Sequence, residues 1–355
     1  MSEDEVVIRV EGGVGRISLN RPRALHALTH GMCRSMTRAL RAWADDPALT
    51  AVILDHVGDR GFCAGGDIRR LTKGNGPAAA VTFFGVEYRL NHLMFVYPKP
   101  ILAVMHGVTM GGGVGISQPA RFRIATEKTV FAMPETGIGL FPDVGGGWYL
   151  PRLPGRVGHW LGLTGARLKA DDCLALGLAT HFVPEAGLDR LKAEVLARPG
   201  ALEDILAPFA QAPGPGTVAG VRPQIDRLFY GDTVEAILAN LRSDGGAWAA
   251  AQLAILATKS PLALKVTLRQ LSEGARAVTF ADEMAVEYRL ARRMSAAQDF
   301  REGVRALLVD RDNAPAWVPA TLDAVSNGMV DAVFAPLPQG QEWTPLDGLD
   351  REERR

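Results

Sequence analysis

The chain has 355 residues, of which 47% are hydrophobic, so it can bury a full core as one large domain or two modest ones. Its 39 basic residues balance 39 acidic ones, which excludes an overall field that would attract nucleic acid or an anionic membrane. Any polyanionic ligand must therefore be bound by a local group of residues.

The N-terminal part of the chain predicts a hairpin, a helix and a strand. Residues 6–10 and 14–19 are β-rich runs joined by two glycines, which indicates a β-hairpin. Thr29 can cap a helix whose apolar residues recur at helical spacing, namely Met32, Met36, Leu40 and Trp43. The apolar run at 51–57 then predicts a strand.

The middle of the chain alternates strands with helices. A glycine-rich loop leads to a helix at about 78–96, which Pro98 stops, and 101–105 predicts a short buried strand before another glycine-rich loop. Two further strand-like runs, 121–126 and 129–133, precede a long Gly/Pro-rich loop. This alternation predicts an α/β fold.

The C-terminal part of the chain is predicted to be mostly helical, because the β signal almost disappears after about residue 187. The Pro/Gly segment 212–217 is typical of a connector between helical pieces. Segment 260–274 begins with a Ser-Pro helix entry and repeats leucines on one face.

Cysteine usage and the N-terminus predict the compartment. Cys33, Cys63 and Cys173 are odd in number and widely spaced, without the CxxC pairs that mark zinc sites or disulfide frameworks. The acidic start differs from a signal peptide, and the weakly polar stretch at 246–258 falls short of the ~18 residues of a membrane span. We therefore expect a soluble cytoplasmic protein.

Three segments combine glycines with functional side chains: 62–68, 106–115 and 133–147. The first two each follow a buried-strand pattern and precede a helix, so their free backbone N–H groups can converge on one ligand oxygen. Such loops can form an oxyanion hole, which stabilises the charge that develops on a carbonyl under attack. The alternative is that each glycine cluster is only a tight turn.

Three carboxylic acids lie among apolar neighbours. Glu135 and Asp143 belong to the third segment, where desolvation would raise their pKa and let one act as a general base on water. If they face each other, repulsion separates their titrations and keeps one proton available. Helix caps or surface charges are the alternative. Glu87 lies on or beside the apolar face of its helix, where it needs a function or an arginine partner.

Other kinds of site have little support. The seven histidines lack HxxxH or HExxH spacing, so we expect no metal site. The segment around Ser117 lacks the last glycine of a GxSxG nucleophile elbow. No strict dinucleotide or P-loop motif occurs, and we expect no cofactor.

Four segments together resemble the crotonase, or enoyl-CoA hydratase/isomerase, superfamily: NRPRALHAL (20–28), FCAGGDI (62–68), HGVTMGGGVG (106–115) and FAMPETGIGLFPDVGGGWYLPRL (131–153). Within it, they are most similar to the branch that hydrolyses 3-hydroxyacyl-CoA thioesters. The resemblance continues at 163–172, 179–183, 260–274, 287–294 and 299–317, and is weak at about 190–255 and at the extreme C-terminus.

The resemblance implies an α/β, crotonase-like spiral of ββα units with a helical C-terminal region. Residues 1–190 would form the core with the acyl-CoA site, 191–340 a mostly helical region covering that site, and 341–355 a frayed tail. The expected partner is a small acyl-CoA molecule, with no nucleic acid or membrane. A homo-oligomer is open, because crotonases are often trimers.

The resemblance also implies a reaction and its residues. The reaction is hydrolysis of 3-hydroxyisobutyryl-CoA, with 3-hydroxypropionyl-CoA as a second candidate, as in valine catabolism. Gly66 and Gly112 would supply the oxyanion hole, while Glu87, Gly112, Glu135 and Asp143 match substrate-binding positions, with Glu135 and Asp143 catalytic. The implied coenzyme A contacts are Arg23, Ala24, Ala64, Asp67 and Ile68. Arg23 could equally be a solvated surface residue.

One departure from the family pattern favours hydrolysis. Hydratases typically carry a second catalytic glutamate three residues after the oxyanion-hole glycine, where this chain has Gly115. An enoyl-CoA hydratase/isomerase and a non-catalytic acyl-CoA-binding protein stay as alternatives. Glu135 would activate water or attack to form a mixed anhydride. Asp143 would bind the 3-hydroxyl or help protonate the leaving thiolate, and Glu87 would orient the acyl end, although these roles could be exchanged.

Overall fold

The computed structural model of the chain describes residues 4–71 and 76–347, which fold into two compact units. Unit 1 comprises Met1–Gly66, Arg89–Phe131 and Arg167–Thr217. Unit 2 comprises Asp67–Tyr88, Ala132–Ala166 and Val218–Arg355. The functional division at residue 190 stays a prediction, and positions 348–355 of the predicted tail lie outside the described residues.

The described strands are β1 Val6–Glu11, β2 Val14–Leu19, β3 Ala51–His56, β4 Gly61–Cys63, β5 Ile101–Met105, β6 Val108–Met110, β7 Phe122–Ala125, β8 Val130–Ala132 and β9 His181–Phe182. The α-helices are α1 His30–Ala44, α2 Ile68–Leu71, α3 Gly76–Phe95, α4 Gly112–Ser117, α5 Gly146–Tyr149, α6 Val157–Thr164, α7 Ala170–Ala175, α8 Leu188–Ala197, α9 Leu202–Leu206, α10 Val218–Leu228, α11 Val234–Asp244, α12 Ala247–Leu256, α13 Pro261–Gly274, α14 Phe280–Met294, α15 Gln298–Val304 and α16 Asn327–Phe334. Short turns of other helix types are η1 Pro22–Ala24, η2 Glu135–Ile138, η3 Leu150–Arg152, η4 Glu185–Gly187 and η5 Arg305–Val309.

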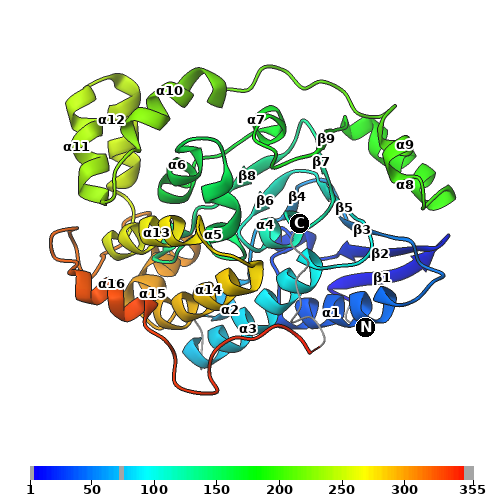
Figure 1. The fold of residues 1–355 in the computed structure, drawn as a ribbon, viewed down its shortest axis with the longest axis horizontal. Helices are drawn as coiled ribbons and strands as arrows, with labels where there is room; N and C mark the ends of the chain where they lie inside the picture. The colour runs from blue at the N-terminus through cyan, green and yellow to red at the C-terminus, as the bar shows by residue number, and fades with distance from the viewer. Residues whose placement is uncertain (1–3, 72–75, 348–355) are drawn as a thin grey trace. The chain divides into compact units, whose positions relative to one another are not determined.

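Unit 1 is built on a six-stranded sheet with the strand order β1-β2-β3-β5-β7-β9 (Figure 1). The predicted hairpin is confirmed, since β1 and β2 pair antiparallel and Gly12 and Gly13 turn between them with φ values of +56° and +81°. The other neighbouring strands run parallel, and β5 has the bounds that the sequence predicts. Carboxyl ends of these parallel strands therefore lie at one edge.

Both faces of this sheet are covered. On one face, apolar residues of β2, β3, β5 and β7 form one cluster with α8 and α9. On the other face, α1 packs so closely that a Cβ on Gly15 would lie 2.4 Å from the Trp43 ring. Thr29 caps α1 by accepting a hydrogen bond from Met32 N at 3.2 Å, which confirms the predicted helix start.

A second sheet, with the order β4-β6-β8, was missed by the sequence analysis, which assigned the segments containing β4 and β6 to glycine-rich loops. Strands of three residues are too short to show an alternating pattern. They matter because β4 and β6 pair in parallel. The two glycine-rich loops that follow them therefore start at the same edge of this sheet.

Unit 2 is mainly helical. From residue 188 to 347, a range that begins with α8 and α9 of unit 1 and continues in unit 2 from Val218, the described chain contains helices and no strand, which confirms the prediction for this region. Ser260 accepts a hydrogen bond from Ala263 N at 3.1 Å at the predicted Ser-Pro start of α13, and α13 packs against α5 and α6. The segment predicted as one long loop instead contains the turns η2, α5 and η3. Within the described residues, we find no helix that is both long and apolar enough to cross a membrane.

Candidate active site

Unit 1 brings the two predicted oxyanion-hole loops together. Gly65 belongs to the loop after β4, and a Cβ placed on it would lie 3.7 Å from Gly112 N and 3.5 Å from Met110 O. A Cβ on Gly113 would lie 2.2 Å from Cys63 O, so only glycine allows this backbone contact. The loops are thus held against each other by backbone packing.

The N–H groups of Gly66 and Gly112 have no hydrogen-bond acceptor within the described parts of unit 1. Gly112 is buried and is the first residue of α4, where an N–H has no partner inside the helix. Two unused donors on adjacent loops can bind one oxygen atom. Ser117, by contrast, is fully buried and donates its hydroxyl to Val114 O at 3.2 Å, so it is not an exposed nucleophile.

The predicted coenzyme A contacts fall in both units. In unit 1, Ala64 N donates to Leu25 O at 3.0 Å, which joins the glycine loop to the turn that carries Arg23 and Ala24. Arg23 is exposed. Asp67 and Ile68 belong to unit 2, at and just before the start of α2. The structure therefore groups Arg23, Ala24 and Ala64 within one unit.

Unit 2 gathers the three predicted acids in its interior. Glu87 lies on α3 and is 2% exposed, whereas Glu135 begins η2 and Asp143 lies in the following loop, each 5% exposed. The hydroxyl of Tyr88 donates to Asp143 Oδ2 at 2.9 Å. None of the three acids forms an ion pair within the described residues. The alternatives of surface charges and of an arginine partner for Glu87 are therefore wrong.

Burial changes the acidity of all three carboxyl groups. It raises the pKa of Glu87 well above the usual range, and the charges of Asp143 and Glu135 raise it further. Burial and Asp143 likewise raise the pKa of Glu135, although Lys259 opposes this. Burial raises the pKa of Asp143 to about 7, against the lowering effect of the Tyr88 hydrogen bond. At neutral pH the group can therefore both hold and release protons.

Two carboxyl oxygens lack a hydrogen-bond partner, which indicates that a ligand supplies one. Glu87 Oε1 and Glu135 Oε2 are buried and accept no hydrogen bond from the described residues. Buried polar atoms normally have partners, because an unpaired one costs about 1–3 kcal/mol. A substrate hydroxyl or a water molecule would supply the missing partner.

The sequence analysis missed two residues that hold this group of acids. Tyr88 was not considered, although it follows Glu87 directly. Glu287 on α14 is fully buried and accepts hydrogen bonds from Gly145 N at 2.8 Å and Gly147 N at 3.0 Å. It thereby fixes the backbone that follows Asp143. The available signal was an acid at helical spacing among the buried apolar residues of α14.

The chain matches a known family over most of its length. A family model described as enoyl-CoA hydratase/isomerase matches residues 14–334. A curated relative from Danio rerio, named 3-hydroxyisobutyryl-CoA hydrolase, mitochondrial, is 44% identical over 344 residues, covering 94% of this chain and 90% of that protein. The Homo sapiens protein of the same name is 42% identical over 357 residues, covering 94% and 89%.

Solved structures agree on the fold. A protein from Mycobacterium thermoresistibile, described as a carnitinyl-CoA dehydratase, matches with a TM-score of 0.91 at 41% identity, covering 96% of this chain and 99% of that one. One from Rhodobacter sphaeroides, described as an enoyl-CoA hydratase, matches with a TM-score of 0.89 at 41% identity, covering 96% and 100%. These matches confirm the predicted crotonase-like α/β fold with a helical C-terminal region.

The predicted cytoplasmic location is contradicted by the relatives' names, which describe mitochondrial proteins. The prediction rested on three widely spaced cysteines without a CxxC pair and on the lack of a signal-peptide pattern. All three cysteines are buried thiols. Free thiols indicate a reducing compartment, but they do not distinguish the cytosol from another such compartment. The cytoplasmic prediction was wrong for this reason.

Proposed function

The chain belongs to the enoyl-CoA hydratase/isomerase family, and we propose that it hydrolyses 3-hydroxyisobutyryl-CoA to 3-hydroxyisobutyrate and coenzyme A, a thioester hydrolysis of valine catabolism. The observation that carries the proposal is the group of three buried carboxyl groups in unit 2, Glu87, Glu135 and Asp143, of which Glu87 and Glu135 each have an oxygen without a hydrogen-bond partner among the described residues. Such a group can activate water and return a proton to a leaving thiolate without a metal or a serine nucleophile.

The proposed oxyanion hole is the pair of N–H groups on Gly66 and Gly112. The thioester oxygen accepts hydrogen bonds from both as it gains negative charge. Two observations support this role: neither N–H group has an acceptor within the described parts of unit 1, and the two loops pack closely against each other.

The proposed base is Glu135, whose buried Oε2 lacks a partner. Glu135 in its ionised form, which Lys259 favours, takes a proton from water, the water oxygen attacks the thioester carbon, and the carbon–sulfur bond breaks. Asp143, with its pKa raised to about 7 by burial, gives a proton to the departing thiolate or binds the 3-hydroxyl. Glu87 orients the acyl end. Direct attack by Glu135, with a mixed anhydride as intermediate, is the other route that these positions allow.

An enoyl-CoA hydratase is the second candidate, because two of the structurally similar proteins carry dehydratase or hydratase descriptions at 41% identity. In this chain the position of the second hydratase glutamate is Gly115, which is buried in α4 and has no carboxylate. Addition of water across a double bond would therefore lack one of its two acid–base groups.

Thiol release distinguishes these functions. Purified protein is given 3-hydroxyisobutyryl-CoA, acetyl-CoA or crotonyl-CoA, and free thiol and crotonyl-CoA absorbance are followed. We expect thiol release from the 3-hydroxyacyl ester alone, and 3-hydroxypropionyl-CoA as a fourth substrate measures the contribution of one methyl group. Loss of crotonyl-CoA absorbance without thiol release would instead identify a hydratase. The same preparation on a sizing column shows whether the protein is a monomer or a homo-oligomer.

Removing the Tyr88 hydroxyl is expected to shift the pH dependence of hydrolysis upwards. The hydrogen bond from Tyr88 stabilises the charged form of Asp143 and so lowers the pKa that burial raises to about 7. In Tyr88→Phe this pKa rises, so the limb of the kcat/KM profile that Asp143 controls moves to higher pH, by roughly one unit.

Tyr97→Phe is the matched control for this experiment. Tyr97 lies in unit 1 and donates its hydroxyl to Leu40 O at 2.8 Å, not to any of the three acids. The pH profile of kcat/KM for Tyr97→Phe should have the same midpoint as that of the unmodified protein. If Tyr88→Phe keeps that midpoint too, Asp143 does not control the profile.

A further inference from the structure

Lys259 lies beside the turn that carries Glu135. It directly precedes Ser260, the N-cap of α13, and belongs to unit 2 together with η2. Ser260 N donates to Thr136 O at 3.2 Å, and both of these residues are fully buried. A Cβ placed on Gly137 would lie 3.5 Å from Lys259 Nζ. The ammonium group is therefore held against the same short turn that begins with Glu135.

The backbone at Lys259 is fixed by hydrogen bonds. Lys259 N donates to Leu256 O at 3.1 Å. The hydroxyl of Ser260 donates to Asp299 and accepts from Ala263 N at 3.1 Å. The place from which the Lys259 side chain starts is thus determined by the fold of unit 2.

The charge of Lys259 is not balanced by an ion pair. Among residues 4–71 and 76–347, its Nζ has no carboxylate within 4 Å and no hydrogen-bond acceptor. The side chain is half-buried, and burial lowers the pKa of Lys259, whereas the charge of Glu135 raises it. The ammonium and the carboxylate therefore each favour the charged form of the other.

Glu135 differs from the other two acids in having a cation as a neighbour. Burial and Asp143 raise the pKa of Glu135, and the charge of Lys259 lowers it. For Glu87, burial and the two neighbouring acids all raise the pKa. For Asp143, the opposing influence comes from the Tyr88 hydroxyl, which carries no charge. Lys259 thus acts on Glu135 specifically.

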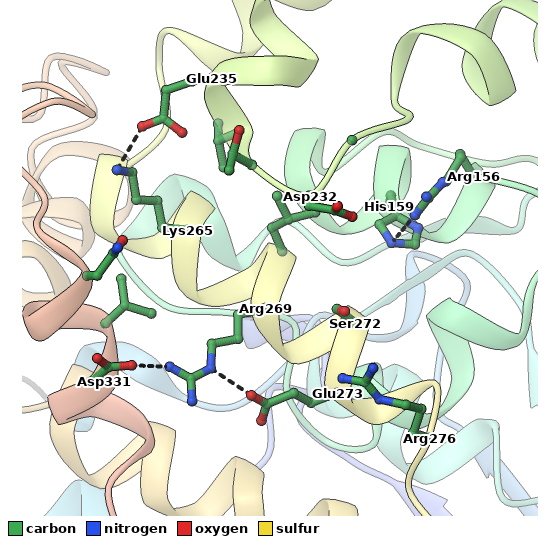
Figure 2. A pocket seen from close by; sticks show the side chains of 16 residues that line it. Arg156, His159, Asp232, Glu235, Lys265, Arg269, Ser272, Glu273, Arg276 and Asp331 are labelled. Atoms are coloured by element: carbon green, nitrogen blue, oxygen red, sulfur yellow. Dashed lines mark hydrogen bonds and ion pairs between the residues drawn. The ribbon is translucent and has the colours of Figure 1, made fainter.

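Other charged side chains around η2 have partners of their own or are exposed. The helices that pack against η2 are α6, α13 and α15. Their titratable residues are accounted for as follows: His159 accepts from Arg156, Lys265 pairs with Glu235, Arg269 pairs with Glu273 and Asp331, Asp299 accepts from Ser260, Glu302 pairs with Arg305, and Arg301 is exposed. Figure 2 shows the pairs of α6 and α13 as dashed lines. These charges do not replace that of Lys259.

We propose that Lys259 is a positioning residue of the hydrolysis, whose ammonium group stabilises the ionised carboxylate of Glu135 and so sets the pH above which Glu135 activates water. This inference rests on the proposed function of Glu135 as the base. Glu135 is 5% exposed and lies near a second acid, so without the cation it holds its proton more tightly. A protonated carboxyl group cannot accept a proton from water.

Lys259→Met tests this role, because methionine has a similar length and no charge. Removing the ammonium group disfavours the charged form of Glu135, so the pKa of Glu135 rises. The limb of the kcat/KM profile on which activity rises with pH should therefore move upwards by roughly one unit, and activity should recover at high pH. A purely structural role would instead lower activity equally at every pH. Lys259→Arg keeps the charge and should keep the midpoint.

Lys265→Met is the matched control. Lys265 is also a half-buried lysine of unit 2, but its Nζ lies 2.7 Å from Glu235, which balances its charge. This variant loses the same charge as Lys259→Met and should keep the midpoint of the unmodified protein. An equal shift in both variants would mean that net charge, and not Lys259, moves the profile, and would overturn the inference.

Infrared titration measures Glu135 without any turnover. The band of its neutral carboxyl group is the part of the spectrum that Glu135→Gln lacks, and its midpoint should rise by roughly one unit in Lys259→Met. If the unmodified protein releases no thiol but this shift occurs, the proposed function fails while the effect of Lys259 on Glu135 is supported. If the midpoint stays unchanged in Lys259→Met and in Lys259→Gln, each with a cooperative unfolding transition, the inference is wrong.

Discussion

Replacing Glu135 with glutamine is expected to reduce thiol release from 3-hydroxyisobutyryl-CoA by roughly 100-fold or more while the substrate still binds. Glutamine has nearly the same shape, but its amide cannot take a proton from water or attack the thioester. The side chain is 5% exposed and its environment favours the neutral form, so an uncharged amide suits the same position. Turnover is measured as free thiol, and binding by titration with the substrate.

A surface control and unfolding temperatures show whether the loss of turnover is due to Glu135 itself. Glu194→Gln changes a half-exposed glutamate of α8 that forms an ion pair with Arg198 at 3.1 Å, and it should keep full activity. The unfolding temperature of Glu135→Gln should match or exceed that of the unmodified protein, because a carboxyl group whose pKa is raised on folding must take up a proton at neutral pH, at a cost in free energy that glutamine avoids. The unfolding temperature of Glu194→Gln should stay nearly unchanged. Unchanged turnover in Glu135→Gln would show that another group activates the water.

The sequence predicts those parts of the fold that depend on local pattern. The segment at β5 is a run of five buried apolar residues, and α1 has both an N-cap and a helical apolar period, so each is recognisable alone. The strands β4 and β6 have three residues each and are stabilised by pairing with each other across 45 residues or more of chain, which no local pattern records.

The candidate site likewise combines residues that the sequence indicates with residues that only the folded chain brings to them. Glu135 and Asp143 stand out because each is an acid in an apolar, glycine-rich segment. Tyr88 donates to Asp143 across 55 positions and Glu287 accepts from Gly145 across 142, so both contacts exist only in the folded chain. The pKa of Asp143 near 7 is likewise a property of burial, which a single sequence does not give.

Replacing Glu287 with leucine is expected to lower both the stability and the turnover of the protein. The carboxylate accepts from the backbone N–H groups of Gly145 and Gly147 and from Gln270 at 3.2 Å. Leucine would leave these donors buried and unpaired, at a cost of about 1–3 kcal/mol each to the free energy of unfolding. The backbone after Asp143 would also lose its anchor, so we expect kcat to fall roughly 10- to 100-fold.

A matched pair of variants distinguishes positioning of Asp143 from general destabilisation. Glu283 lies one turn earlier on α14, is 2% exposed, and has a pKa raised to about 8 by burial, so Glu283→Gln replaces a largely protonated group and should keep stability and kcat. Glu287→Gln keeps one acceptor oxygen and should recover part of the activity that leucine loses. Turnover is measured well below the unfolding temperature of each variant, where every molecule is folded. If Glu287→Leu then regains full kcat, the contact stabilises the fold alone; a persistent loss that glutamine partly restores means that Glu287 holds the Asp143 backbone in its reactive position.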